Sequence, residues 1–338
     1  MTRNQNEIDK FLDDKITNAE REIDKLFASR LKELLLQLSN MYHKYTSGKD
    51  LSHTDLNKYN RFKKEMALMA EAIDQDYRLL LKEIQALMEA QYIENYLRSA
   101  YLYEFEAQET MGFGVPSLNV VRKAIENPIE LLKLSKLLEG QRNEIVRKIS
   151  TDIAQGLLAG ESYSDISFRI EKSVMFSAKK ARRVARTEGH RTQVQGRLDS
   201  AKKASKHVEF KKMWDGTLDG RTRTAHRKLD GTIVDFDGIF VSIAGGKGIA
   251  PGLMFNASDD CNCRCSVLFL VNGKKPEMRR SRNEEDPAYQ KKLANRIEKY
   301  MNEGLTHTQA EKKAKREIKP PSLVIPYQSY EQWYKKIA

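Results

Sequence analysis

The chain has 338 residues, of which 31% are charged and 40% are apolar, a composition typical of a soluble, helix-rich protein and not of a disordered or fibrous one. Its longest unbroken apolar run is far shorter than a membrane span, and its N-terminus lacks the apolar stretch of a signal peptide, so we expect a protein kept in a cytoplasm and no membrane contact. The three cysteines lie within five residues, which excludes a disulfide framework across the fold.

Basic residues are concentrated in the second half of the chain. Residues 1–140 contain 20 lysines and arginines against 23 acidic residues, whereas residues 141–338 contain 39 against 24. The density is highest between residues 179 and 228, with 16 basic and 5 acidic side chains. Basic side chains often do no more than solvate a helix, but a field this one-sided favours an anionic partner, most commonly nucleic acid. We therefore expect the second half to contact nucleic acid.

The first 110 residues predict a long helical hairpin. Apolar residues recur at steps of three and four from Ile8 to Tyr45, which indicates an amphipathic helix. A second helix is predicted to begin at the capping residues Ser52 or Thr54 and to continue as far as Gln108, roughly 85 Å if unbroken at 1.5 Å per residue. Helices this long exceed the needs of a compact domain, so we expect the hairpin to project or to pack against other subunits.

The segment 111–116, with two glycines and a proline, interrupts the helical pattern, and we predict a domain boundary there. A helical region is expected over residues 111–205. Its short helices are predicted at 117–126, 129–139, 141–159 and 162–173, followed by a long basic helix at 177–205.

The basic helix places several cations on one side, because residues spaced by three, four or seven positions return to nearly the same angle. This face carries Lys179, Arg183, Arg186, His190 and Arg197. We predict nucleic-acid contacts from Lys179, Arg183, Arg186, Arg197, Lys202 and Lys203.

After residue 206 the pattern changes to short strands separated by glycines, which predicts a small α+β module over residues 206–272. Strands are expected at 208–214, 232–234, 240–243 and 265–271. Residues 273–338 predict a charged tail with helices at 287–302 and 306–317 and a proline-rich extended arm at 319–326. The aromatic residues Tyr330, Trp333 and Tyr334 suggest that the tail docks onto a surface. The predicted fold class is thus mostly α with a small α+β module.

The most specific residues form separate blocks in a fixed order. They are Ala185-Arg186-Thr187-Glu188, Trp214-Asp215-Gly216, Asp219-Gly220-Arg221-Thr222-Arg223 with His226, Leu229-Asp230-Gly231, and Asn262-Cys263-Arg264-Cys265. Over about residues 150–272 this pattern resembles the minor head, or head morphogenesis, protein family of tailed bacteriophages, which contains a Mu F-like domain.

The resemblance implies a structural protein of the virion without catalytic activity or small-molecule substrate. Such a protein is made in the host cytoplasm and sits in few copies inside the phage head near the portal. The implied partners are the portal protein, the scaffold or major capsid protein, and packaged DNA bound without sequence preference.

The cysteine cluster allows two interpretations. His226 with Cys261, Cys263 and Cys265 could supply four ligands of the types that zinc prefers, and alternate residues of an extended segment point to the same side. The spacing is not the Cys-x-x-Cys usual in zinc sites, and Cys261 is the weakest candidate because the family pattern has only the other two. The alternative, which we favour, is that the cysteines are small packed residues at the start of a strand, with His226 hydrogen-bonded nearby.

The charged motif residues are also open to two interpretations, and we favour a buried salt-bridge network over direct phosphate contact. The expected members of this structural network are Arg186, Glu188, Trp214, Asp219, Arg221, Arg223 and Asp230. A competing function is a metal-dependent nuclease using His226 with Asp219 or Asp230, but the motif offers no second histidine. A host nucleic-acid-binding regulator is disfavoured because no helix-turn-helix or finger signature is present.

Overall fold

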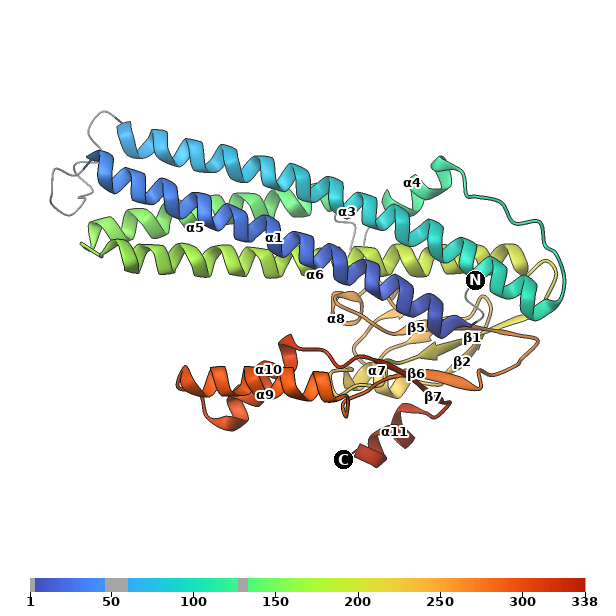
Figure 1. The fold of residues 1–338 in the computed structure, drawn as a ribbon. Coiled ribbons are helices and arrows are strands. Elements are labelled where there is room, and N and C mark those ends of the chain that lie inside the picture. Colours follow the sequence, from blue (N-terminus) through green and yellow to red (C-terminus); the bar gives the residue numbers. More distant parts are fainter. Residues whose placement is uncertain (1–3, 46–59, 127–132, 338) are drawn as a thin grey trace.

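The computed structural model describes residues 4–45, 60–126 and 133–337. Four long helices lie side by side and form a bundle, as Figure 1 shows. They are α1 (Gln5–Tyr45), α3 (Arg61–Ala107), α5 (Leu134–Leu158) and α6 (Tyr163–Ala204). The short α4 (Leu118–Glu126) packs beside α3 and α6. The predicted fold class, mostly α with a small α+β module, is confirmed. None of the described helices carries an apolar stretch that could cross a membrane.

The N-terminal hairpin forms as its apolar periodicity predicts, although the expected start of its second helix at Ser52 or Thr54 lies outside the described residues. The hairpin does not project alone. One hydrophobic core joins all four long helices, with Leu34 of α1, Leu80 of α3, Ile149 of α5 and Val174 of α6 all buried in it. The two sides of the predicted boundary at residue 111 therefore share a core.

Two pairs of predicted helices are single helices. The separate helices expected at 162–173 and 177–205 are both parts of α6, because no glycine or proline lies between them to end the first. The helix begins at a capping box formed by Ser162 and Asp165. Likewise, the helices expected at 129–139 and 141–159 meet in α5 through Gly140, where an added Cβ would touch nothing. The predicted start of the first of them, at residue 129, lies outside the described residues. One glycine costs a helix only about 1 kcal/mol, which the buried apolar face of α5 outweighs.

The α+β module lies beneath the end of the bundle where α6 finishes (Figure 1). Its antiparallel sheet has the order β2 (Ile233–Asp235), β1 (Phe210–Asp215), β5 (Ser266–Val271), with Met213 opposite both Ile233 and Leu268. The strands β3 (Phe240–Val241) and β4 (Lys247–Gly248) form a small ribbon. Two short helices, α7 (Thr224–Leu229) and α8 (Ala257–Asp260), were not predicted, because one turn is too short to show helical periodicity.

The charged tail folds back onto the module. Its helices α9 (Pro287–Asn302) and α10 (His307–Glu317) match the predicted ones. The proline-rich arm is extended as expected, and it pairs as strand β7 (Ser322–Pro326) with β6 (Met278–Arg282). The strand β6 was not predicted, because its three arginines obscure the apolar pattern of a strand. The last helix, α11 (Tyr330–Ile337), buries Tyr330 and Trp333 against Leu218 of the module. The predicted docking surface for the tail is thus part of the same chain.

Candidate metal centre and charged network

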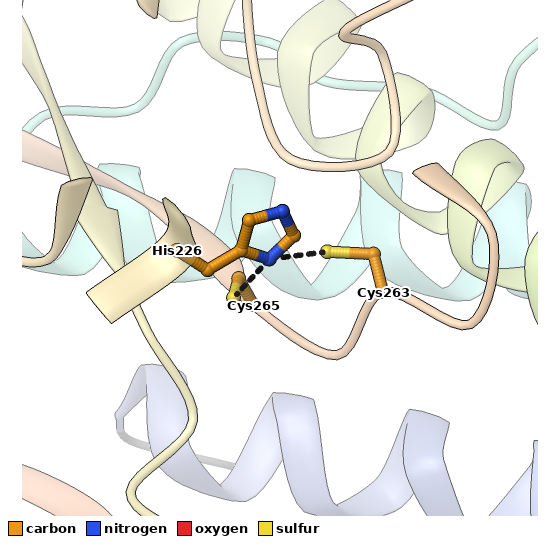
Figure 2. Close-up of side chains that lie close together, drawn as sticks. All are labelled: His226, Cys263 and Cys265. Atoms are coloured by element: carbon orange, nitrogen blue, oxygen red, sulfur yellow. Dashed lines mark hydrogen bonds between the residues drawn. The ribbon is translucent and has the colours of Figure 1, made fainter. Parts of the chain in front are cut away.

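Three predicted metal ligands meet in the interior of the module. His226 projects from α7, Cys263 follows α8, and Cys265 directly precedes β5. The Nδ1 of His226 lies 3.3 Å from the Sγ of Cys265 and 3.8 Å from that of Cys263 (Figure 2). All three residues are buried, and their ligand atoms lie within 4.8 Å of one another. Cys261 is not part of this group.

The other face of the histidine is held by a carboxylate that we did not predict. The Nε2 of His226 lies 3.2 Å from Oδ1 of Asp259, a fully buried residue of α8. The same carboxylate accepts hydrogen bonds from the Ser242 hydroxyl at 2.7 Å and from the backbone N–H of Gly246 at 3.0 Å. A side chain at Gly246 would collide with it, since a Cβ there would lie 2.3 Å from Oδ2 of Asp259. These contacts hold the Asp259 carboxylate in place independently of its contact with the imidazole.

Burial and mutual contact shift the titration of this group. The hydrogen bond from the Cys263 thiol lowers the pKa of Cys265 well below its ordinary value, and His226 acts in the same direction. The hydrogen bond to Cys265, together with burial, raises the pKa of Cys263. Burial alone would lower the pKa of His226, but the hydrogen bond and charge of Cys265 raise it overall. Cys265 is therefore the more readily ionised of the two thiols.

Trp214, which we expected in the salt-bridge network, packs against this centre instead. Its side chain is fully buried, and its ring meets those of His226 and Phe240 edge to face, each with centroids 5.3 Å apart. It belongs to the same hydrophobic cluster as the two cysteines. Trp214 therefore packs the centre and takes no part in ion pairing.

A buried ion-pair network surrounds Asp219, and its main partner is Arg264. The guanidinium of Arg264 binds the Asp219 carboxylate with two hydrogen bonds, the longer of them 3.0 Å. The Arg221 side chain is more distant, with Nη2 3.8 Å from Oδ2 of Asp219. Burial would raise the pKa of Asp219, but the hydrogen bonds and charge of Arg264 lower it overall. The sequence pattern alone did not indicate this role for Arg264.

Arg223 does not contact Asp219, contrary to the prediction. Its guanidinium donates to the backbone carbonyls of Asp259, at 2.8 Å, and Cys261. It therefore fixes the segment that carries the metal-centre residues. The reason is geometric, since Arg223 sits immediately before α7 and faces α8 instead of the Asp219 turn.

A second buried network joins the module to the tail through Asp230. This carboxylate accepts from the backbone N–H groups of Gly216, at 2.8 Å, and Tyr330, at 2.7 Å, and it pairs with the buried Arg279 of β6. The Nε of Arg279 also lies 2.9 Å from Asp215. Burial raises the pKa of Asp215 to about 7 despite this arginine. Arg279 was not predicted, because nothing near it in sequence indicates burial.

Arg186 and Glu188 lie outside both networks. Arg186 forms two hydrogen bonds of 2.7 and 2.6 Å with Glu20 of α1, so it joins two helices of the bundle. Glu188 pairs with Arg191 at 2.9 Å, and Arg191 donates to the last carbonyls of α4. Glu20 lies 166 residues before Arg186, so helical periodicity does not indicate this partner, whereas Glu188 and Arg191 are neighbours one turn apart on α6.

The predicted nucleic-acid face is divided between the interior and the surface. Arg186 and Arg197 are buried, and Arg197 is paired with Asp9 and donates to the carbonyl of Val267. The structure therefore contradicts the predicted nucleic-acid contact for these two arginines. Lys203 is half-buried and donates to the carbonyl of Gly112 at 2.6 Å. Lys179, Arg183 and Lys202 are exposed.

His190 of the same face also points inward. Its Nε2 donates to the carbonyl of Cys265 at 2.8 Å, and burial lowers its pKa, so the neutral ring suits the interior. Gly252 lies against the ring with a φ of +81°, and a Cβ there would lie 2.7 Å from Nδ1 of His190. The basic helix α6 thus contacts the module through buried side chains: His190 binds the carbonyl of Cys265 and Arg197 binds that of Val267.

Comparisons with known proteins agree with the motif. The family described as Phage Mu protein F like protein matches residues 147–268. A minor head protein of Bacillus phage SPP1 is 51% identical over 280 residues, which cover 83% of this chain and 91% of that protein. An NAD(+)–arginine ADP-ribosyltransferase of Enterococcus faecalis is 34% identical over 183 residues, which cover 53% of this chain but only 37% of the enzyme. No solved structure matches the chain significantly.

The predicted resemblance over about residues 150–272 coincides with the matched domain, and the similarity to the phage protein extends across the helical bundle as well. The match to the enzyme leaves most of that protein uncovered. The chain therefore belongs to the minor head protein family of bacteriophages that contains a Mu F-like domain.

Proposed function

We propose that this chain is a non-catalytic structural component of a phage head, that it acts in head assembly near the portal, and that it contacts packaged DNA without sequence preference. Similarity to a minor head protein over most of both chains supports the structural role. The DNA contact rests on one observation of the fold, namely a cluster of cations that its own carboxylates do not balance.

We call this group the cationic cluster, and it lies where α1, α6, the Asp219 turn and the tail meet. Three carboxylates, Asp13, Glu20 and Asp219, pair with six cations. The cations are Arg186, Arg221, Arg264, Arg280, Arg282 and Lys319. Asp9 and Asp215, which also lie in this region, are occupied by Arg197 and Arg279. Positive charge is therefore in excess in a region of low solvent access.

The excess of positive charge affects the pKa values of two of these cations, Lys319 and Arg221. Burial, reinforced by the charges of Arg186 and Arg221, lowers the pKa of Lys319 to about 8. Burial also lowers the pKa of Arg221, and the charge of Arg264 adds to this effect. An anion placed between these side chains would relieve the repulsion, and a phosphate is an anion that accepts several hydrogen bonds at once.

A cavity opens beside the cluster and gives such an anion access. It has a volume of about 430 Å³ and lies between the Asp219 turn and α10. Its charged lining consists of the cations Arg221, Lys312, Lys315 and Arg316 and the carboxylates Asp219, Glu284 and Glu311. Lys315 is paired with Glu311 at 2.7 Å, whereas Lys312 and Arg316 have no carboxylate within 4 Å in the part of the chain that the structure describes. We propose that Arg221, Lys312, Arg316 and Lys319 contact the DNA backbone here.

Exposed cations of α6 extend this surface. Lys179 and Arg183 share a helix face with the exposed apolar residues Phe168 and Met175. Apolar and basic groups side by side suit contact with head proteins as well as with DNA. We propose that the bundle docks on portal, scaffold or capsid subunits through such faces, and that Lys179, Arg183 and Lys202 add phosphate contacts.

DNA binding can be tested with the full chain, because the bundle and module share elements. The binding constant of a duplex of random sequence should fall as salt rises, with log K losing roughly 0.9 per phosphate contact for each decade of salt. The variant Lys312→Ala/Arg316→Ala/Lys319→Ala should lose affinity equally for all sequences and should reduce this slope by up to about 2 to 3. A matched control is Lys275→Ala/Lys291→Ala/Lys292→Ala, which removes three exposed lysines away from the cavity.

Equal losses in the two triple variants would show that diffuse charge and not the cavity binds DNA. Absence of binding at low salt would reject the DNA contact altogether. The head role is tested separately by mass spectrometry of purified virions and empty proheads, in which the chain should be present at low copy number. Its absence from both particles would contradict the proposal.

The rival nuclease function finds little support in the geometry. Asp219 is bound by Arg264, Asp230 by Arg279 and two backbone N–H groups, and His226 by Asp259. A nuclease needs a metal-bound water beside an accessible phosphodiester. His226 is buried, and both aspartates are engaged by the fold itself. We therefore regard these residues as structural.

A further inference from the structure

The group around His226 points to a property that neither the family nor its relatives specify. We propose that the chain binds one zinc ion through Nδ1 of His226 and the Sγ atoms of Cys263 and Cys265, with Asp259 orienting the histidine and Cys261 excluded. The ion would fasten α7 to the start of β5 and thereby stabilise the module.

The spacing of the donor atoms fits zinc. With Zn–S bonds of about 2.3 Å and Zn–N bonds of about 2.0 to 2.1 Å, tetrahedral geometry places neighbouring donors roughly 3.5 to 3.8 Å apart. The two sulfur atoms lie 3.3 and 3.8 Å from Nδ1, one just below this range and one at its upper end. Figure 2 shows both thiols directed at the same ring nitrogen.

Hydrogen bonding alone explains this convergence poorly. A neutral imidazole nitrogen has one lone pair in the plane of the ring, so it accepts well from only one thiol. A cation between the three atoms would satisfy all of them at once. Two thiolates and one divalent ion are also neutral as a set, which lowers the cost of burying them beside Trp214.

The surroundings of the histidine match those of a metal ligand. Zinc-binding histidines usually donate the second ring N–H to a carboxylate, which fixes the tautomer and leaves the other nitrogen free for the metal. Asp259 occupies this position 3.2 Å from Nε2, and its own contacts with Ser242 and Gly246 hold it in place. Arg223 donates to the backbone carbonyls of Asp259 and Cys261, so the loop before Cys263 is also fixed.

Within the described ranges, no fourth histidine, cysteine or carboxylate joins the group. We therefore assign the fourth tetrahedral position to a water molecule. Soft sulfur with imidazole nitrogen favours zinc over the hard cations magnesium and calcium, which prefer oxygen ligands.

The test uses the full chain produced in zinc-supplemented medium. Metal analysis and native mass spectrometry should find one zinc per chain. Cys263→Ser and Cys265→Ser should lose the ion, whereas the matched control Cys261→Ser, two residues from Cys263, should keep it. Asp259→Asn should retain the same ligands but weaken zinc affinity about 10- to 100-fold in competition with a chelator.

A spectroscopic measurement on the unmutated chain covers the case in which the cysteine variants do not fold. After removal of zinc, titration with Co²⁺ should give a thiolate-to-cobalt charge-transfer band and strong visible bands of tetrahedral cobalt, with an end point at one equivalent. A folded protein that contains no zinc and gives no such bands overturns the proposal. Loss of zinc from Cys261→Ser would overturn the ligand set.

Discussion

In the helical bundle the buried side chains are mainly apolar and come from all four long helices, whereas the α+β module and tail bury arginines and carboxylates in pairs. Ile16, Leu80 and Ile153 illustrate the bundle, and Arg279, Asp230 and Asp219 the module. The bundle can use simple periodicity because its helices are long. The apolar core of the module is divided among smaller clusters, and directional ion pairs and hydrogen bonds hold its loops in addition.

The difference has a consequence for stability. Loss of an apolar side chain from the bundle removes packing energy and leaves a cavity. Loss of one partner from a buried ion pair leaves an uncompensated charge, which costs more than the pair contributes. The following predictions use this contrast.

The largest effect is expected from Arg279→Met. The substitution leaves Asp230 and Asp215 buried beside an apolar chain, and we expect a loss of about 3 to 5 kcal/mol in the free energy of unfolding. The control Arg296→Met breaks a pair with Glu317 in which both side chains are 41% exposed, and it should cost at most about 1 kcal/mol. Urea unfolding of both variants measures the difference, and equal costs would show that the buried network is not special.

A somewhat smaller effect is expected from Ile153→Ala in the bundle. Ile153 is fully buried in the shared core, so the free energy of unfolding should fall by about 2 to 5 kcal/mol. Ile153→Val removes one methylene at the same position and should cost about 0.5 to 1.5 kcal/mol. If thermal or urea unfolding gave the same value for both, the position would not be closely packed.

A third effect concerns the pH dependence of stability. Burial raises the pKa of Asp215 to about 7 in the folded chain from the ordinary value of 3.8. The folded state then binds the proton more tightly, so this carboxyl's contribution is complete below about pH 4 and is lost as pH rises towards 7. In this window the free energy of unfolding should fall by at most about 1.4 kcal/mol per pH unit.

Urea unfolding at several pH values compares the unmutated chain with Asp215→Asn, which should lack this slope. Asp13, Glu20 and Asp219 do not interfere, because nearby arginines lower their pKa values against the effect of burial and place their contribution at lower pH. Parallel profiles between pH 4 and 7 would show that Asp215 is charged in the fold throughout.

The sequence predicted the long helices well because their apolar spacing is a local signal that repeats over many turns. It also predicted that His226, Cys263 and Cys265 could lie together, since the residue types suit a metal. It did not identify Asp259, although two adjacent aspartates directly precede Cys261. The partners of Asp219 and Asp230, Arg264 and Arg279, were missed because every arginine in a basic segment looks alike in sequence.

The sequence by itself determined the helices of the N-terminal hairpin, the basic character of the second half and the family motif, all of which depend on composition, periodicity or residue order. Only the tertiary structure decided which cations are internal. Arg186 and Arg197 share a helix face with Lys179, yet they meet Glu20 and Asp9 of α1 and are buried, while Lys179 remains exposed. Helical periodicity fixes the angle of a side chain but not what lies opposite it, and that depends on contacts between segments more than 150 residues apart.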